Sequence, residues 1–347
     1  MRVGAIITVA AEDQRRGTLN DETPSQSLFS LGISPVVCQE LLGQTLLQRT
    51  RQSLRESGID QQTVLFEQPG CKSLIPSGSR TAESFSSSWE TAVCQQLSDG
   101  AEVLLLIRLG AYLEIDFRDL LGFHREASTG LTQVYGKKSA FDLGVVSASQ
   151  LRTEAGSYRG RLSALIPQCC HYNFSGYSNR LREPADLRRL VYDALTGRNA
   201  IRPNGEQAGP GIWIGTGASV DLSASLSAPV YIGANTQIKG SCIINGGTAI
   251  ERDCEVDFGT TVTDSCVLPG TYVGMGLNIM HSIVAPNRLF HLDRNVGMDI
   301  SDAHILGSRL PTSILAGFTK SFTKKGSLKR VSANLFGTLS HLYEEEF

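Results

Sequence analysis

Branched apolar residues stand at every sixth position between residues 214 and 268, and this period constrains the fold more than any other feature of the chain. An amphipathic helix repeats every 3.6 residues and a half-buried strand every two, so neither produces this pattern. A period of six is typical of hexapeptide β-helix repeats, in which each repeat forms one short side of a coil. The series consists of Ile214, Val220, Leu226, Ile232, Ile238, Ile244, Ile250, Val256, Val262 and Leu268.

The fourth residue after each of these is small or compact almost throughout, which suits a narrow interior. We therefore expect an all-β, left-handed parallel β-helix over residues 209–285, with about 18 residues in each three-sided coil. Cys242, Cys254 and Cys266 belong to the compact row, and we expect them in the interior, because free cysteine behaves as a small buried hydrophobe.

The first 205 residues alternate between apolar runs and amphipathic segments, which predicts an open α/β sheet of Rossmann-like type. The run over 102–107 is apolar at nearly every position, as in a central parallel strand. A linker rich in Gly, Pro and Asn follows over 197–211. We expect further strands over 3–10, 63–66 and 141–148, and helices over 39–58, 82–98, 116–127 and 184–196.

Composition limits the classes of function. The chain has 347 residues and a net charge of −2, so global charge gives no reason to expect nucleic-acid binding. No apolar run approaches the roughly 20 residues of a membrane-spanning helix. The eight cysteines lack paired C-x-x-C spacing, so neither a zinc site nor a disulfide framework is indicated, and we expect a cytoplasmic protein.

Several segments resemble the sugar-1-phosphate nucleotidyltransferase family, in which an α/β domain precedes a short left-handed β-helix. GISPVVCQELLGQ, from residue 32, is similar to that family's proline-to-glycine segment. AEVLLLI at 101–107, with the helix after it, resembles the strand and helix around the first metal-binding aspartate. FDLGVV at 141–146 and GYSNRLREPADLRRL at 176–190 resemble the strand beyond the sugar pocket and the segment of the second aspartate.

The chain departs from the family at the chemistry. Where the resemblance places a lysine, the residue is Val36. The first metal aspartate falls on Gly110 or Ala111, and the second falls on Arg180. Nucleotidyl transfer builds up charge on phosphoryl oxygens, which Mg²⁺ held by carboxylates normally neutralises. The resemblance therefore implies a pseudoenzyme of a sugar-nucleotide pathway, acting as a regulatory or scaffolding subunit or as a sugar-nucleotide binder.

Under this resemblance, four positions are expected to bind nucleotide or phosphate. Arg15 matches the family's phosphate-contacting arginine, and Thr81 and Ala82 match part of its nucleotide contact. Arg180 supplies a cation close to where a metal would lie. We expect no cofactor, with Mg²⁺ needed only if the chain is an active enzyme. Arg180, Arg182, Arg188 and Arg189 form a basic stretch that suits either phosphate binding or a solvated helix face.

Two enzymatic alternatives stay open. In the first, the chain is an active pyrophosphorylase whose metal ligands are displaced to Glu114 or Asp116, although acids are also common at a helix start. In the second, it is a hexapeptide acyltransferase that uses His281 as general base. A structural role for His281 is the simpler interpretation, since one histidine is a weak motif.

We also expect self-association, or association with a related nucleotidyltransferase subunit. Open β-helix ends need a cap or a partner, and Tyr231, Phe258 and Tyr272 are predicted to point outward as apolar anchors. Residues 286–347 form a C-terminal extension without the six-residue period. Its basic residues between 320 and 330 fit a solvated tail, or less readily a membrane-surface contact.

Overall fold

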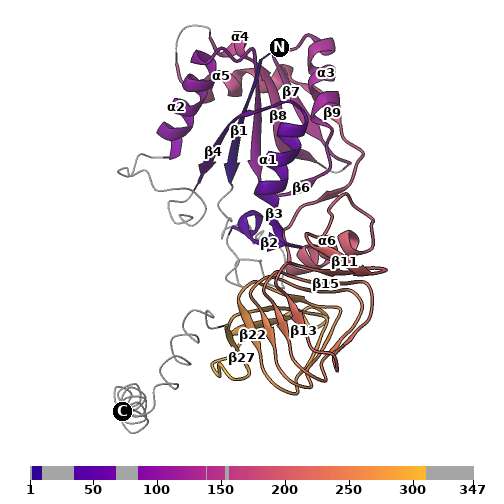
Figure 1. Ribbon diagram of the computed structural model, residues 1–347. Coiled ribbons are helices and arrows are strands. Elements are labelled where there is room, and N and C mark those ends of the chain that lie inside the picture. Colours follow the sequence, from indigo (N-terminus) through magenta and orange to yellow (C-terminus); the bar gives the residue numbers. More distant parts are fainter. Residues whose placement is uncertain (1, 10–34, 68–84, 138, 153–155, 310–347) are drawn as a thin grey trace, which may run out of the picture. The chain divides into compact units, whose positions relative to one another are not determined.

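The computed structural model describes residues 2–9, 35–67, 85–137, 139–152 and 156–309. They form an α/β region followed by a strand-rich region (Figure 1). The described residues as far as Gly307 belong to one compact unit. Three predicted site residues, Arg15, Thr81 and Ala82, lie outside the described residues, as does the basic tail.

A six-stranded mixed sheet forms the centre of the α/β region. In sheet order its strands are β4 (Gln61–Phe66), β1 (Val3–Val9), β5 (Val103–Leu109), β8 (Ala140–Ser147), β7 (Leu131–Tyr135) and β9 (Cys170–Asn173). β1 runs parallel to both β4 and β5, as predicted, whereas β8 runs antiparallel to β5 and β7. The central apolar strand β5 therefore has a parallel neighbour on only one side.

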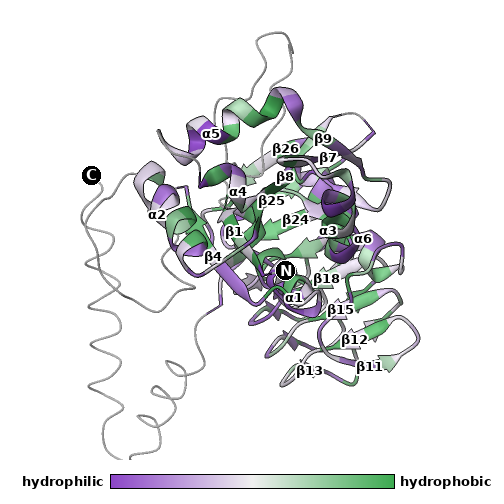
Figure 2. Ribbon diagram, turned by 90° about the horizontal axis from the view of Figure 1, so that it is seen from above, coloured by the Kyte–Doolittle hydropathy of each residue, from purple (hydrophilic) through white to green (hydrophobic). Residues whose placement is uncertain are grey.

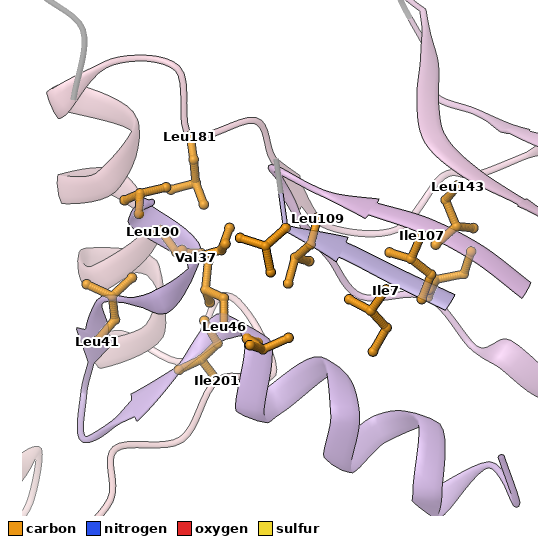
Figure 3. Packing of buried hydrophobic residues seen from close by; sticks show 14 of the residues in the cluster. Ile7, Val37, Leu41, Leu46, Ile107, Leu109, Leu143, Leu181, Leu190 and Ile201 are labelled. Atoms are coloured by element: carbon orange, nitrogen blue, oxygen red, sulfur yellow. The ribbon is translucent and has the colours of Figure 1, made fainter. Parts of the chain in front are cut away.

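Helices cover both faces of this sheet. Side chains alternate along each strand, so Ile7 of β1 joins one core and Ile6 joins the other. The helices α1 (Leu46–Glu56), α3 (Phe117–Ala127) and α6 (Pro184–Leu195) pack in the first core, and Figure 3 shows the α6 side chain Leu190 close to Val37. The second core is closed by α2 (Phe85–Ser98), α4 (Ala148–Leu151) and α5 (Tyr158–Leu165).

Short elements complete this region. They are two 3-10 turns, η2 (Val36–Cys38) and η4 (Ile166–Gln168), and two pairs of two-residue strands, β2 (Glu40–Leu41) with β3 (Gln44–Thr45) and β6 (Tyr112–Leu113) with β10 (Ser178–Asn179).

The helix predicted over 39–58 is wrong in its first turns, because α1 begins only at Leu46. The preceding residues form the β2–β3 hairpin, whose turn places Leu42 and Gly43 at φ values of 55° and 81°. A left-handed turn cannot continue a right-handed helix. Thr45 then caps α1 by accepting a hydrogen bond from the Gln48 backbone at 3.0 Å.

Three sheets of short strands make up the strand-rich region, and the strands that stack one coil apart are parallel, an arrangement compatible with the predicted β-helix. The first sheet has β11 (Glu206–Gly209), β12 (Ile212–Ile214), β15 (Val230–Ile232), β18 (Thr248–Ile250), β21 (Cys266–Val267), β24 (Ser282–Ala285), β25 (Arg288–His291) and β26 (Val296–Asp299). β11 pairs antiparallel with β12 at the start of this sheet. The second has β13 (Ser219–Val220), β16 (Gln237–Ile238), β19 (Glu255–Val256), β22 (Thr271–Val273) and β27 (Leu306–Ser308). The third has β14 (Ser225–Leu226), β17 (Ile243–Ile244), β20 (Thr261–Thr263) and β23 (Asn278–Met280).

The six-residue series is confirmed as far as Val262. Residues one coil apart pair in register, as Ile232 does with Ile250 and Ile244 with Val262. These side chains share one interior cluster with Cys242 and Cys254. The side chains that the sequence pattern placed inside the coils therefore do form their interior.

Beyond Val262 the predicted register is wrong by one residue. Ile250 pairs with Val267 rather than with Leu268, so the coil between them has one residue fewer than the coil before it. Val267 takes the interior position, and the series continues through Val273. Cys266 and Leu268 are buried instead on the opposite side of the sheet, in the core shared with the α/β region.

The outer side of the first sheet is covered. Tyr231, Ala249 and Ile283 stand at outward positions on it, but all three are buried within the core that also contains α1 and α6. Figure 2 shows the hydrophobic colouring of β15, β18 and β24. The prediction that Tyr231 is an exposed anchor is therefore wrong, since only 1% of its surface is accessible.

Strands continue past the predicted end of the β-helix at residue 285. β25 folds back antiparallel to β24, and β26 returns along it. β27 then adds to the second sheet beside β22. These antiparallel strands lack the six-residue period because they do not coil. Among the described residues, no helix is long and apolar enough to cross a membrane.

Candidate functional site

The positions that the family resemblance assigns to metal and phosphate chemistry hold no lysine or carboxylate, but Val36, Gly110 and Arg180. Val36 is 4% exposed and packs in the first core. Gly110 follows β5 and carries no side chain. The guanidinium carbon of Arg180 lies 4.5 Å from the centre of the Phe141 ring, and Nη2 donates to the Ser139 carbonyl at 3.2 Å. A cation thus stands where the resemblance requires a carboxylate.

The two acids considered as displaced ligands have structural roles. Asp116 is the N-cap of α3, where its carboxylate accepts hydrogen bonds from the backbone of Arg118 at 2.8 Å and of Asp119 at 3.3 Å. Glu114 accepts from the Tyr112 hydroxyl at 3.0 Å and from the Ala200 backbone N–H. The structural interpretation of Asp116 as a helix cap is thereby supported.

The carboxyl ends of β4 and β5 carry an ionic cluster that sequence analysis missed. Arg108 contacts Glu67 through two hydrogen bonds, at 2.6 and 2.9 Å, and Asp142 at 3.3 Å. The hydrogen bonds that Arg108 donates to Glu67 hold the pKa of Arg108 above its ordinary value. In open α/β sheets this edge is where ligands usually bind. Here Arg108 is already neutralised by the carboxylates of Glu67 and Asp142, so Arg108 is poorly suited to bind a triphosphate.

Metal ligands do not gather within the described part of the chain. No group of three or more His, Cys, Asp or Glu side chains there is arranged to hold a metal ion. The three cysteines of the coils, Cys242, Cys254 and Cys266, are buried. Burial raises the pKa of the Cys266 thiol to about 11, so this thiol is a poor nucleophile.

His281 has a specific partner. Its Nδ1 lies 2.7 Å from Oδ2 of Asp264, while its side chain remains 43% exposed. The two residues lie 17 positions apart and occupy neighbouring coils, because the coils here repeat every 17 residues. Both backbones adopt left-handed turns, with φ of 45° and 46°. A carboxylate on Nδ1 fixes the imidazole and leaves Nε2 as the nitrogen that can exchange a proton with a substrate.

Asp264 also binds a cation through its other oxygen. Nη2 of Arg188 pairs with Oδ1, and Nε donates to the Asp264 backbone carbonyl at 3.0 Å. Arg188 comes from α6, and its side chain is 8% exposed. The carboxylate thus joins a helix of the α/β region to a histidine of the coils. Sequence analysis identified His281 and Arg188 but missed Asp264, whose signal was its place one coil before His281.

The structure therefore places the predicted residues apart in two groups. Arg180 lies with Phe141 and Ser139, whereas His281 contacts Asp264 near α6. No protein-family model matches the chain, and no curated protein matches its sequence.

Proposed function

We propose that this chain is a sugar-nucleotide pathway protein of nucleotidyltransferase ancestry that performs no nucleotidyl transfer. Its Rossmann-like domain, joined to a left-handed β-helix, would act as a regulatory or scaffolding subunit, or bind a sugar nucleotide without turnover. The observation that carries this proposal is Arg180, which packs on Phe141 where the resemblance requires a metal-binding aspartate. A guanidinium repels Mg²⁺, so the metal-assisted route is lost.

Any remaining nucleotide binding should be independent of metal. Arginine pairs with phosphate directly and in two-point geometry, so Arg180, with Arg15 of the N-terminal segment, would replace the charge of Mg²⁺. Thr81 and Ala82 would contact the nucleotide. No cofactor is required in this proposal, and Mg²⁺ enters only if the chain is an active enzyme.

The test measures pyrophosphate exchange by the full chain with each common NTP, sugar 1-phosphate and Mg²⁺. We expect no exchange above a protein-free control. Calorimetric titration of nucleotide sugars with and without EDTA then measures binding, and we expect equal affinities. Turnover that Arg15→Ala eliminates, or affinity that EDTA abolishes, would show that the metal ligands were assigned to the wrong residues.

A scaffolding role needs an interface, and the coils offer one. Leu222, Phe258 and Met275 occupy the same turn in different coils, and they are 105%, 52% and 66% exposed. The third sheet beside this turn carries no charged residue on its strands, and Ile243 and Met280 are 44% exposed on it. Interface cores are depleted of charge and enriched in aromatic residues and Met. The uncharged strands of the third sheet also meet those of a second copy without charge repulsion.

The contact between His281 and Asp264 favours acyl transfer as a second candidate function. In that reaction Nε2 would take a proton from an acceptor amine or hydroxyl as this attacks a thioester carbonyl. The carbon–sulfur bond breaks, and the thiolate leaves with the proton that the imidazole returns. Asp264 would stabilise the imidazolium formed in between.

Release of free thiol from acetyl-coenzyme A in the presence of a panel of amines and sugars tests this function. Thiol release that falls at least 100-fold in His281→Ala and in Asp264→Asn would support it. No release by the wild-type chain, or equal release by the variants, would leave the pseudoenzyme proposal in place.

A further inference from the structure

A pocket of about 590 Å³ lies between α6 and the corner of the coils that precedes the first sheet. One wall is a single face of α6, formed by Ala185, Arg188, Arg189 and Tyr192. The other wall includes Gly247 and Asp264, which precede β18 and β21 in consecutive coils. Pockets for small organic ligands in proteins are usually between about 300 and 1,000 Å³.

The pocket depends on a glycine. A Cβ atom at Gly247 would lie 2.6 Å from Oδ1 of Asp264 and 2.8 Å from Nη2 of Arg188. Its φ of +81° is also the left-handed conformation that favours glycine. The backbone of the coil therefore approaches the ion pair closely, and no side chain intrudes at that point.

Two arginines, Arg188 and Arg189, and one carboxylate, Asp264, line the pocket. Arg189 also pairs with Asp186, outside the lining, at 3.3 Å. Asp264 engages Nε and Nη2 of Arg188, but Nη1 is buried without a hydrogen-bond partner in the described part of the chain. A buried cationic donor without an acceptor is costly, and an oxyanion supplies the strongest acceptor for it.

The rest of the lining is apolar. Tyr192, Pro229 and Leu292 face the pocket, and the Tyr192 ring is 5.2 Å from the guanidinium carbon of Arg188. An ion pair beside an aromatic and aliphatic wall suits a molecule with one anionic end and one apolar part. The lining includes no cationic residue other than Arg188 and Arg189, so it offers no separate site for a second anionic group.

We propose that this pocket binds a small organic molecule carrying a single oxyanion group, held by Arg188 and Arg189 and packed against Tyr192. Binding there does not depend on either activity considered above. The ligand would also contact the residue that orients His281, because Asp264 is shared by both.

The test titrates phenyl phosphate and benzoate into the full chain by calorimetry, with benzyl alcohol as the neutral probe of similar shape. We expect saturable binding of at least one anion, with affinity at least tenfold above that of benzyl alcohol. Phosphate and carboxylate ligands are distinguished by which anion binds more tightly.

Three variants locate the binding. Ala185 is exposed at the pocket rim, so Ala185→Trp should occlude it without disturbing the core, and should weaken anion binding at least tenfold. Arg189→Gln should weaken it about three- to tenfold, whereas Arg182→Gln, an exposed residue outside the pocket, should leave it within twofold. Wild-type affinity in Ala185→Trp, equal effects of the two Gln variants, or no preference for the anions would overturn the proposal.

Discussion

The side chain of Glu251 accepts a hydrogen bond of 2.6 Å from the backbone N–H of Leu42, a residue 209 positions earlier in the chain. Its second oxygen lies 3.2 Å from the N–H of Gly43. Both donors belong to the left-handed turn of the β2–β3 hairpin, which has no ladder partner for them there. A glutamate of the coils thus accepts hydrogen bonds from two backbone N–H groups of the turn that precedes α1.

Replacing Glu251 should change how stability depends on pH. Burial raises the pKa of Glu251 to about 8 from an ordinary value of 4.5. The folded chain therefore holds a proton that the unfolded chain has released, so this stabilisation is present below pH 4.5 and is lost as pH rises through about 8. The expected loss is on the order of 4 kcal/mol across that interval.

Denaturant unfolding of the wild type and of Glu251→Gln between pH 5 and pH 8.5 measures this loss. The amide cannot ionise, so the difference between the two proteins should shift in favour of Gln as pH rises. Glu206→Gln makes the same chemical change at an exposed site, and should show a difference that is flat with pH. A flat difference for Glu251→Gln as well would contradict the assignment.

His124 should make the fold sensitive to acid. It is 3% exposed, and its ring nitrogens lie 2.8 Å from the Thr132 hydroxyl and 3.0 Å from the Ser147 hydroxyl. Burial lowers its pKa below 6.5, so its stabilising effect is full above pH 6.5 and is lost as pH falls below that value. We expect a loss of at most about 1.4 kcal/mol per pH unit, which His124→Phe should remove. Acid titrations of the wild type and of His124→Phe, followed by circular dichroism, measure this loss. The difference in stability between the two proteins should shrink as pH falls below 6.5, and a constant difference would contradict the prediction.

Ile243 and Ile244 allow a direct test of which side chains fill the coils. They are adjacent in β17, yet Ile244 is fully buried and Ile243 is 44% exposed. Ile244→Ala should cost about 2–5 kcal/mol of unfolding free energy, because it leaves a cavity. Ile243→Ala should cost less than about 0.5 kcal/mol. Equal costs, measured by denaturant unfolding, would mean that the register of the third sheet is wrong.

The exposed row formed by Leu222, Phe258 and Met275 should govern self-association. We expect light scattering of the wild type at micromolar concentration to give more than one subunit. Leu222→Ser with Phe258→Ser should shift the mass toward one subunit, because it removes the apolar centre of the proposed interface. Ile166→Ser, at a residue 55% exposed in the α/β region, is the matched control and should leave the mass unchanged. A wild type that is monomeric, alone and with a related nucleotidyltransferase present, would refute the scaffolding proposal.

The coils were predictable from sequence because each interior position imposes the same size and polarity on every turn. That rule failed after Val262, where a turn one residue shorter moved Val267 inward and Leu268 outward. Both residues are apolar, so a strict count of six does not distinguish them. The prediction that Tyr231 is exposed was wrong for a related reason. The sequence does not show that the α/β region covers the first sheet.

The candidate sites were less predictable than the fold. His281 was identifiable as a residue type, but its partner Asp264 comes from another coil and depends on the 17-residue spacing. The cluster of Glu67, Arg108 and Asp142 likewise joins three strands that are distant in sequence. Local patterns specify which faces are buried, whereas these contacts depend on how strands stack.

The contact between Glu251 and Leu42 has a consequence for synthesis. Chains are made at about 5–20 residues per second, so the 209 residues between the two positions take roughly 10–40 s to translate. Through that interval the nascent α/β region lacks the acid that satisfies its hairpin turn, together with the apolar face of the first sheet that closes its core. Ribosome-bound chains that end before the second coil should therefore be more easily cleaved by protease near Leu42 than chains that extend past Glu251.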